Sequence, residues 1–148
     1  RTEAKAYIDA YFENYPGVLS YMDNTKEIAK AQGYVETVMG RRLYLPQINA
    51  KNKMLQQHAL RTAINAPMQG SSADIIKKAM LDVYQWIGDD NTDIKMIMQV
   101  HDELVFEVKA SKADEFAHKI QTLMSDTCPL DIPLVVDVGI GDSWQQAH

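Results

Sequence analysis

The stretch MQVHDELVFEV, residues 98–108, sets two adjacent acidic residues between two apolar runs. Apolar residues alternate with other residues along 94–100, and the alternation continues along 104–108. A period of two residues is typical of β-strands. We therefore predict an antiparallel hairpin whose turn carries Asp102 and Glu103. Strict alternation would place one set of residues on a single face of the first strand: Ile94, Met96, Met98 and Val100.

The segments that flank this hairpin predict two helices and one more strand. Residues 71–87 carry an apolar stripe at helical spacing, and residues 111–124 repeat that pattern behind a Ser-x-x-Asp cap at Ser111 and Asp114. Residues 132–140, IPLVVDVGI, predict a last strand. The second half of the chain is thus expected to be β-β-α-β, an antiparallel sheet with a helix on one face.

The first half is predicted to be mainly helical. Residues 1–33 predict two helices that break near Pro16, with Gly33 as the stop of the second. Residues 34–46 predict a short hairpin with Gly40 at its turn. Residues 52–65 are helical in pattern, Pro67 is expected to interrupt them, and a new helix is expected after Gly70 with Ser71 or Ser72 as its N-cap. The predicted fold class is α+β.

Composition narrows the class of protein. The 148 residues are 46% hydrophobic, which suits one packed domain, and no run is long enough for a membrane span. The single cysteine, Cys128, excludes an internal disulfide and a Cys-rich zinc site, so a reducing, cytoplasmic location is expected. The chain begins at Arg1 and not at Met, so we expect it to be a piece of a longer protein.

Charge is distributed unevenly along the chain. Residues 1–78 hold 11 of the 15 Lys and Arg and 7 of the 20 Asp and Glu, a net charge of +4, and residues 79–148 hold the others, a net charge of -9. The basic first region can contact the phosphates of a nucleic-acid backbone, and the acidic second region can bind cations. Two ordinary solvated faces explain the same distribution.

The acidic pair at the predicted turn is a candidate metal site. Asp102 and Glu103 would face opposite sides of a straight strand, but at a tight turn both can reach one exposed concavity. Two such carboxylates repel each other, and Mg²⁺ relieves the repulsion by taking one or two carboxylates together with water and phosphate. The alternative is a solvated turn that happens to be acidic.

A polar row is predicted on the helix that precedes Pro67. Gln57, Arg61, Asn65 and Gln69 follow one another in steps of four, which places them along one helix face. Such hydrogen-bond donors can contact the acceptors that every base pair offers in the minor groove. An ordinary solvated helix face is the alternative. His101 can be a ligand, a proton donor or a space-filling residue, and no other histidine forms a zinc-ligand spacing with it.

Three segments together resemble the bacterial family A DNA polymerases. They are GYVETVMGRRLYLP at 33–46, RTAINAPMQGSSADIIKKAM at 61–80 and MIMQVHDELVFEV at 96–108. The resemblance extends over the whole chain, including VGIGDSWQQAH at 138–148, which is similar to the carboxyl-terminal end of that family.

The resemblance implies a role for each candidate residue. Asp102 would bind the catalytic Mg²⁺ ions, Glu103 would assist there, and His101 would lie near the primer terminus. Three helix residues would contact primer–template DNA in the minor groove: Arg61, Asn65 and Gln69. Residues 1–60 would belong to the fingers subdomain and residues 61–148 to the palm.

The implied activity is template-directed nucleotidyl transfer from deoxynucleoside triphosphates to a primer 3′-hydroxyl by a two-metal mechanism. It would serve DNA replication and repair in the cytoplasm. The family also requires the patterns D-x-S-x-x-E-L-R and R-x-x-x-K-x-x-x-F-x-x-x-Y, and neither occurs in this sequence. We therefore expect this chain alone to be inactive, and to expose a sheet edge through which copies can associate. A non-catalytic DNA-binding module is the alternative function, and a structural domain that binds protein partners is a third.

Overall fold

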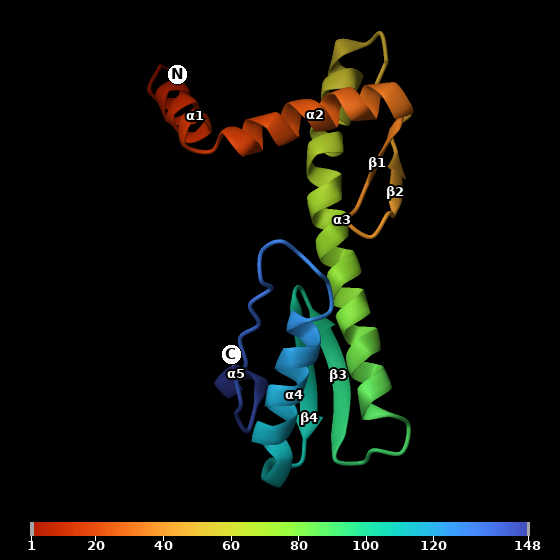
Figure 1. Ribbon diagram of the computed structural model, residues 1–148, viewed down its shortest axis with the longest axis vertical. Coiled ribbons are helices and arrows are strands. Elements are labelled where there is room, and N and C mark those ends of the chain that lie inside the picture. The colour runs from red at the N-terminus through yellow and green to blue at the C-terminus, as the bar shows by residue number, and fades with distance from the viewer. Residues whose placement is uncertain (1, 148) are drawn as a thin grey trace. The chain divides into compact units, whose positions relative to one another are not determined.

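The computed structural model describes residues 2–147 (Figure 1). The chain divides into two compact units, Arg1–Ser71 and Ser72–His148. Each unit has its own buried core, so each is described by itself.

The first unit begins with two helices, as the sequence predicts. Helix α1 spans Thr2–Asn14 and α2 spans Pro16–Gln32, with the proline at the start of α2, where its missing N–H is not needed. Gly33 ends α2 in the left-handed conformation, at φ 79°, and its N–H donates a hydrogen bond of 2.9 Å to the carbonyl oxygen of Ala29. A residue with a Cβ is disfavoured in that conformation, which explains the glycine.

A short hairpin follows α2. Strand β1, Tyr34–Glu36, pairs antiparallel with β2, Arg42–Tyr44, and Gly40 takes φ 79° in the connection. The hairpin prediction is confirmed. The core beneath it combines residues of α2, the hairpin and the following helix, α3, which spans Lys53–Ile87. Its buried members are Ala29, Val35, Leu45, Ile48, Ala59 and Ala63.

The predicted break at Pro67 is wrong, because α3 is continuous from Lys53 to Ile87 with the proline inside it. A proline removes only one helical hydrogen bond, and the packed turns around it keep the helix whole. The predicted N-cap at Ser71 or Ser72 is also wrong, because no new helix begins there; Gly70 and Ser71 instead contact the β1–β2 connection. A Cβ on Gly70 would lie 2.6 Å from Thr37 Cγ2, and the Ser71 hydroxyl accepts a hydrogen bond of 2.9 Å from the N–H of Val38.

The second unit contains the hairpin predicted from residues 98–108. Strand β3, Ile94–Val100, pairs antiparallel with β4, Glu103–Val108. The prediction that Met98 shares a face with Met96 is wrong, because a β-bulge lies between them: Met96 pairs with Phe106, whereas Met98 pairs with Val105. The extra residue reverses the alternation beyond this point.

Helix α4, Ala113–Ser125, covers one face of this hairpin (Figure 1). The core contains α3, sheet and α4 residues, with Val83, Ile94, Phe116 and Ile120 buried. The predicted Ser111–Asp114 cap is wrong, because a 3-10 turn, Ala110–Lys112, leads into α4 and no side chain caps it.

The predicted last strand does not form within the described residues, since 132–140 pairs with no other strand there. The strand-like pattern of this segment favours pairing with another strand. Here, however, the carbonyl oxygen of Val136 accepts a hydrogen bond of 2.7 Å from Gln121 Nε2 on α4. The chain then returns on itself in α5, Trp144–Ala147. The α+β class is confirmed, with two sheets of two strands each in place of the expected β-β-α-β sheet.

Candidate active site and nucleic-acid interface

The turn of the β3–β4 hairpin brings three of the predicted site residues together. Val100 pairs with Glu103, so His101 and Asp102 alone form the two-residue connection. His101 adopts φ 53°, and it is the only non-glycine residue with positive φ that the structure describes. Backbone conformations of this kind are uncommon outside glycine and concentrate at functional sites.

Alternation along β4 determines which face of the hairpin Glu103 occupies. Residues that pair directly across two antiparallel strands lie on the same face, and alternate residues of one strand share a face. Glu103 therefore lies with its partner Val100 on the face opposite Phe106, whose side chain packs against the core. His101 and Asp102 are exposed, and Glu103 is half-buried.

The carboxylate oxygens at this turn suit a hard divalent cation whose coordination shell is completed by ligands from outside the turn. Carboxylate oxygens suit Mg²⁺, which takes one or two protein carboxylates and fills its remaining positions with water and phosphate. No group of three or more potential metal-ligating side chains gathers anywhere in residues 2–147. The turn thus supplies part of a coordination shell and not a closed protein cage.

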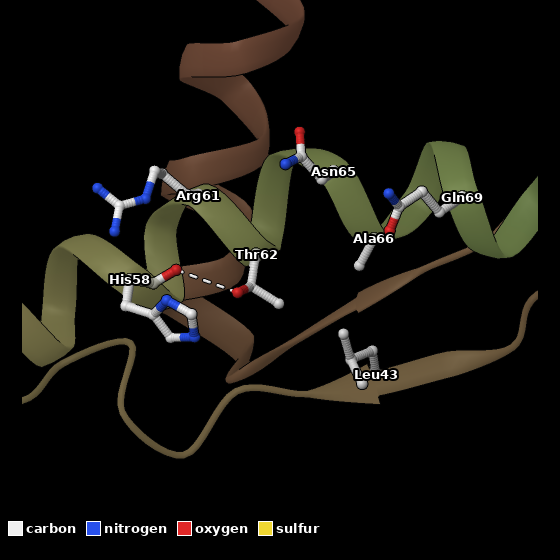
Figure 2. Close-up of a pocket in the computed structure, with 7 residues that line it drawn as sticks. All are labelled: Leu43, His58, Arg61, Thr62, Asn65, Ala66 and Gln69. Carbon is white, nitrogen blue, oxygen red and sulfur yellow. Dashed lines mark hydrogen bonds between the residues drawn. The ribbon is translucent and has the colours of Figure 1, made fainter.

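The polar row of α3 lies in the first unit. Arg61, Asn65 and Gln69 are exposed and line a shallow hollow of about 340 Å³. Figure 2 shows their side chains along one side of α3, while His58 and Thr62 lie toward the hairpin. The hollow has four further lining residues: Leu43, His58, Thr62 and Ala66.

Packing on the other side of α3 keeps the polar row exposed. Ala59 and Ala63 are buried in the core, at 5% and 0% exposure. The Tyr21 hydroxyl of α2 donates a hydrogen bond of 3.0 Å to the carbonyl oxygen of Ile64, which ties α2 to this stretch of α3. Because the small residues face inward, Arg61 and Asn65 are turned toward the solvent.

Arg42, the residue before Leu43 of the hollow, already takes part in interactions within the hairpin. Arg42 Nε lies 2.7 Å from Glu36 Oε1 across the hairpin, and its guanidinium carbon lies 4.5 Å from the centre of the Tyr34 ring. Its hydrogen bond to Glu36, followed by that to Tyr44, raises the pKa of Arg42 above its usual value. Arg42 therefore stiffens the hairpin, and Arg61 is the cation of the hollow itself.

The predicted site residues thus form two groups in different compact units. His101, Asp102 and Glu103 share the hairpin turn, and Arg61, Asn65 and Gln69 share the α3 hollow. Sequence reasoning missed Leu43 and His58 as parts of that hollow. The spacing of His58 from Arg61, three residues along a helix, carried a signal. Leu43 comes from the hairpin and carried none.

No helix among residues 2–147 has the length and apolar character needed to cross a membrane.

The chain matches the sequence model described as DNA polymerase family A over residues 1–146. It is 53% identical to DNA polymerase I of Pseudomonas aeruginosa over 148 residues, which is all of this chain and 16% of that protein. It is 42% identical to DNA polymerase I of Bacillus subtilis over 147 residues, or 99% of this chain and 17% of that protein. The chain therefore spans about a sixth of the length of these relatives.

Solved structures include a close match to this fold. The POL domain of Pol1 from M. smegmatis, in complex with DNA primer-template and dNTP, matches with a TM-score of 0.94 and 43% sequence identity. The match covers 99% of this chain and 26% of that one.

Proposed function

This chain belongs to DNA polymerase family A, and from that premise we propose that it is part of a DNA-directed DNA polymerase. In the longer protein, its residues would serve template-directed nucleotidyl transfer to a primer 3′-hydroxyl. The observation that carries the proposal is the β3–β4 turn, where an exposed Asp102 and a half-buried Glu103 follow a residue held at positive φ.

Asp102 and Glu103 would provide the oxygen ligands of the site. Glu103 is the first residue of β4 and Asp102 precedes it in the turn, so the paired strands would hold both carboxylates near their working positions before substrate binds. Mg²⁺, the cofactor that this donor set fits, would neutralise phosphate charge and lower the pKa of a primer hydroxyl. The chain's own contribution is to hold the exposed Asp102 carboxylate beside the half-buried Glu103, where deoxynucleoside triphosphates would reach them.

The α3 hollow would receive primer–template DNA. Arg61, Asn65 and Gln69 offer guanidinium and amide donors from one helix face, and these match the acceptors that all four base pairs present in the minor groove. Donors placed in this way sense pair geometry and not base identity. A mispaired terminus displaces the acceptors and leaves donors unpaired, which disfavours its extension. His101 would lie near the primer end.

The subdomain assignment is also a proposal. Residues 1–60 are assigned to fingers and 61–148 to palm on the motif resemblance, and DNA replication and repair in the cytoplasm follow from the same source. Self-association of the separate chain is proposed from the exposed apolar residues of the unpaired segment 132–140. Val135, for example, is 80% exposed. Sedimentation velocity over a range of concentrations tests it.

The deciding experiment is primer extension by the longest natural polymerase that contains this sequence. Asp102→Asn keeps the shape of the side chain and removes its charge. Asp90→Asn makes the same change at an exposed residue of a different turn and is the matched control. We expect Asp102→Asn to reduce extension by roughly a thousand-fold or more while primer–template affinity stays near that of the wild type, since the carboxylate acts on charge in the transition state.

Two other outcomes are informative. Extension that survives in Asp102→Asn within a few-fold would mean that the turn is an ordinary acidic one, and the proposal would fail. DNA binding without extension in the wild-type polymerase would favour the non-catalytic DNA-binding module. Where Asp102→Asn does reduce extension, the Asp90→Asn control separates a specific effect from a general effect of lost negative charge.

A further inference from the structure

The side chain of Gln99 reaches over the hairpin turn. Its amide nitrogen, Nε2, donates a hydrogen bond to the main-chain carbonyl oxygen of His101. That carbonyl belongs to the peptide group that joins His101 to Asp102. Because a peptide group is planar, holding its oxygen also sets the direction of the Asp102 N–H and restricts the rotation that aims the Asp102 side chain.

The bulge at Ile97 is what brings Gln99 to this position. Beyond the bulge, Gln99 pairs with Leu104, so it shares a face with Leu104 and Phe106, whereas Glu103 and Val100 share the other face. The amide therefore approaches the turn from the side away from Glu103. It can hold the backbone without occupying the space in front of that carboxylate.

We propose that Gln99 is a positioning residue for the acidic turn, with its amide holding the His101 carbonyl so that Asp102 and Glu103 converge. The inference rests on the proposed polymerase function for its catalytic consequence. Its structural part stands on the turn alone. His101 occupies a backbone region that non-glycine residues disfavour, so the turn needs a restraint from outside, and the Gln99 side chain supplies a hydrogen bond at that point.

The first test measures the turn itself, without metal. Gln99→Met keeps the length of the side chain and removes the donor. Gln85→Met makes the same change at an exposed residue of α3 and is the control. In the longest natural polymerase that contains this sequence, Gln99→Met should speed hydrogen exchange of the amides at 101–103 while the β3–β4 amides farther from the turn keep their rates. Unchanged exchange at the turn would overturn the proposal.

The second test measures the consequence for catalysis. Gln99→Met should raise the Mg²⁺ concentration at half-maximal extension by roughly ten-fold, as loss of a hydrogen bond that orients a ligand does. Its dissociation constant for primer–template should stay at the wild-type value. Gln99→Asn keeps an amide on a side chain one methylene shorter and should behave like Gln99→Met. A loss confined to DNA affinity would show that Gln99 contacts DNA directly, and it would overturn the positioning role.

A rescue variant separates the positioning role from other causes. Glycine adopts positive φ readily, so in a His101→Gly background the turn should no longer need the restraint. Gln99→Met should then cause little further change in turn exchange or in Mg²⁺ dependence. Equal effects in both backgrounds would contradict the proposal. If Asp102→Asn abolishes extension while Gln99→Met changes nothing, only this inference fails, and if Asp102→Asn is active, the proposed function itself fails.

Discussion

The methyl group of Thr37 occupies the space that a side chain at Gly70 would need. A Cβ on Gly70 would lie 2.6 Å from Thr37 Cγ2, well inside van der Waals contact. The Thr37 hydroxyl accepts a hydrogen bond of 3.1 Å from the N–H of Arg41, which restrains its rotation away from α3. A glycine within a long helix is therefore explained by the approach of the β1–β2 connection.

This relationship predicts that Gly70→Ala changes the free energy of unfolding in opposite directions, depending on whether residue 37 is threonine or serine. Gly70→Ala gains about 1 kcal/mol of helix propensity but introduces an overpacked contact that costs roughly 1–3 kcal/mol. We expect the single variant to lower the free energy of unfolding of the first unit. Combined with Thr37→Ser, which keeps the hydroxyl and removes the methyl, Gly70→Ala should become stabilising. Urea unfolding of the wild type, the two single variants and the double variant measures this. A stability change of the same sign in both backgrounds would refute the packing explanation.

The hollow on α3 predicts a contrast between two glutamines of one row. Gln69 lines the hollow, and Gln57 lies three steps of four earlier in the same row but does not line it. Gln69→Ala should weaken discrimination against a mispaired primer end by about 1–3 kcal/mol, the value of a well-formed groove contact. Gln57→Ala should leave it unchanged. Extension of matched and mismatched primers by the longer polymerase is the measurement, and equal effects of the two variants would remove the hollow from the DNA interface.

Stability in acid should depend on Asp93, which joins the β3 end of the hairpin to the 3-10 turn. Lys112 Nζ lies 2.8 Å from Asp93 Oδ2, and Lys109 Nζ lies 3.4 Å from Oδ1. The Lys112 hydrogen bond is the main cause that holds the pKa of Asp93 below its ordinary value of 3.8, and Lys109 adds to it. A carboxyl group whose pKa is lowered by folding stabilises the folded state fully at pH values above its pKa in the unfolded chain. This stabilisation is lost as the pH falls through its pKa in the folded state.

We therefore expect the free energy of unfolding to differ between wild type and Asp93→Asn by an amount that depends on pH. Near neutral pH the wild type should be the more stable, and the gap should close as pH falls below 3.8. Urea midpoints measured at several pH values test this, with Asp90→Asn as a control that should show no such gap. A gap that stays constant down to the lowest pH would show that Asp93 acts through shape and not through charge.

The chain on its own should not extend a primer. Its sequence contains neither D-x-S-x-x-E-L-R nor R-x-x-x-K-x-x-x-F-x-x-x-Y, the patterns expected to supply a second catalytic aspartate and the triphosphate grip. We expect no template-dependent product from the purified chain with Mg²⁺ and all four deoxynucleoside triphosphates. Product that requires both template and Mg²⁺, and that disappears in Asp102→Asn, would contradict this prediction.

Local patterns identified most of the elements and both groups of candidate residues. Pro16 and Gly33 mark the ends of helices because their backbone preferences act within one or two residues. The acidic turn was predictable for the same reason, since alternation over a few residues defines two strands and the short connection between them. The row from Arg61 to Gln69 follows directly from helical spacing.

Tertiary structure decided the features that depend on distant partners. Pro67 lies within an unbroken helix because packing outweighs one lost hydrogen bond. The segment 132–140 has a strand pattern but no partner strand among the described residues, and pairing requires an edge that no local pattern can supply. The bulge at Ile97 shows the same limit: one unpaired residue reversed the alternation and brought Gln99 across the turn. The sequence alone determined which residues are candidates for the chemistry, and the pairing of strands decided the direction from which each approaches, because register is a property of two segments together.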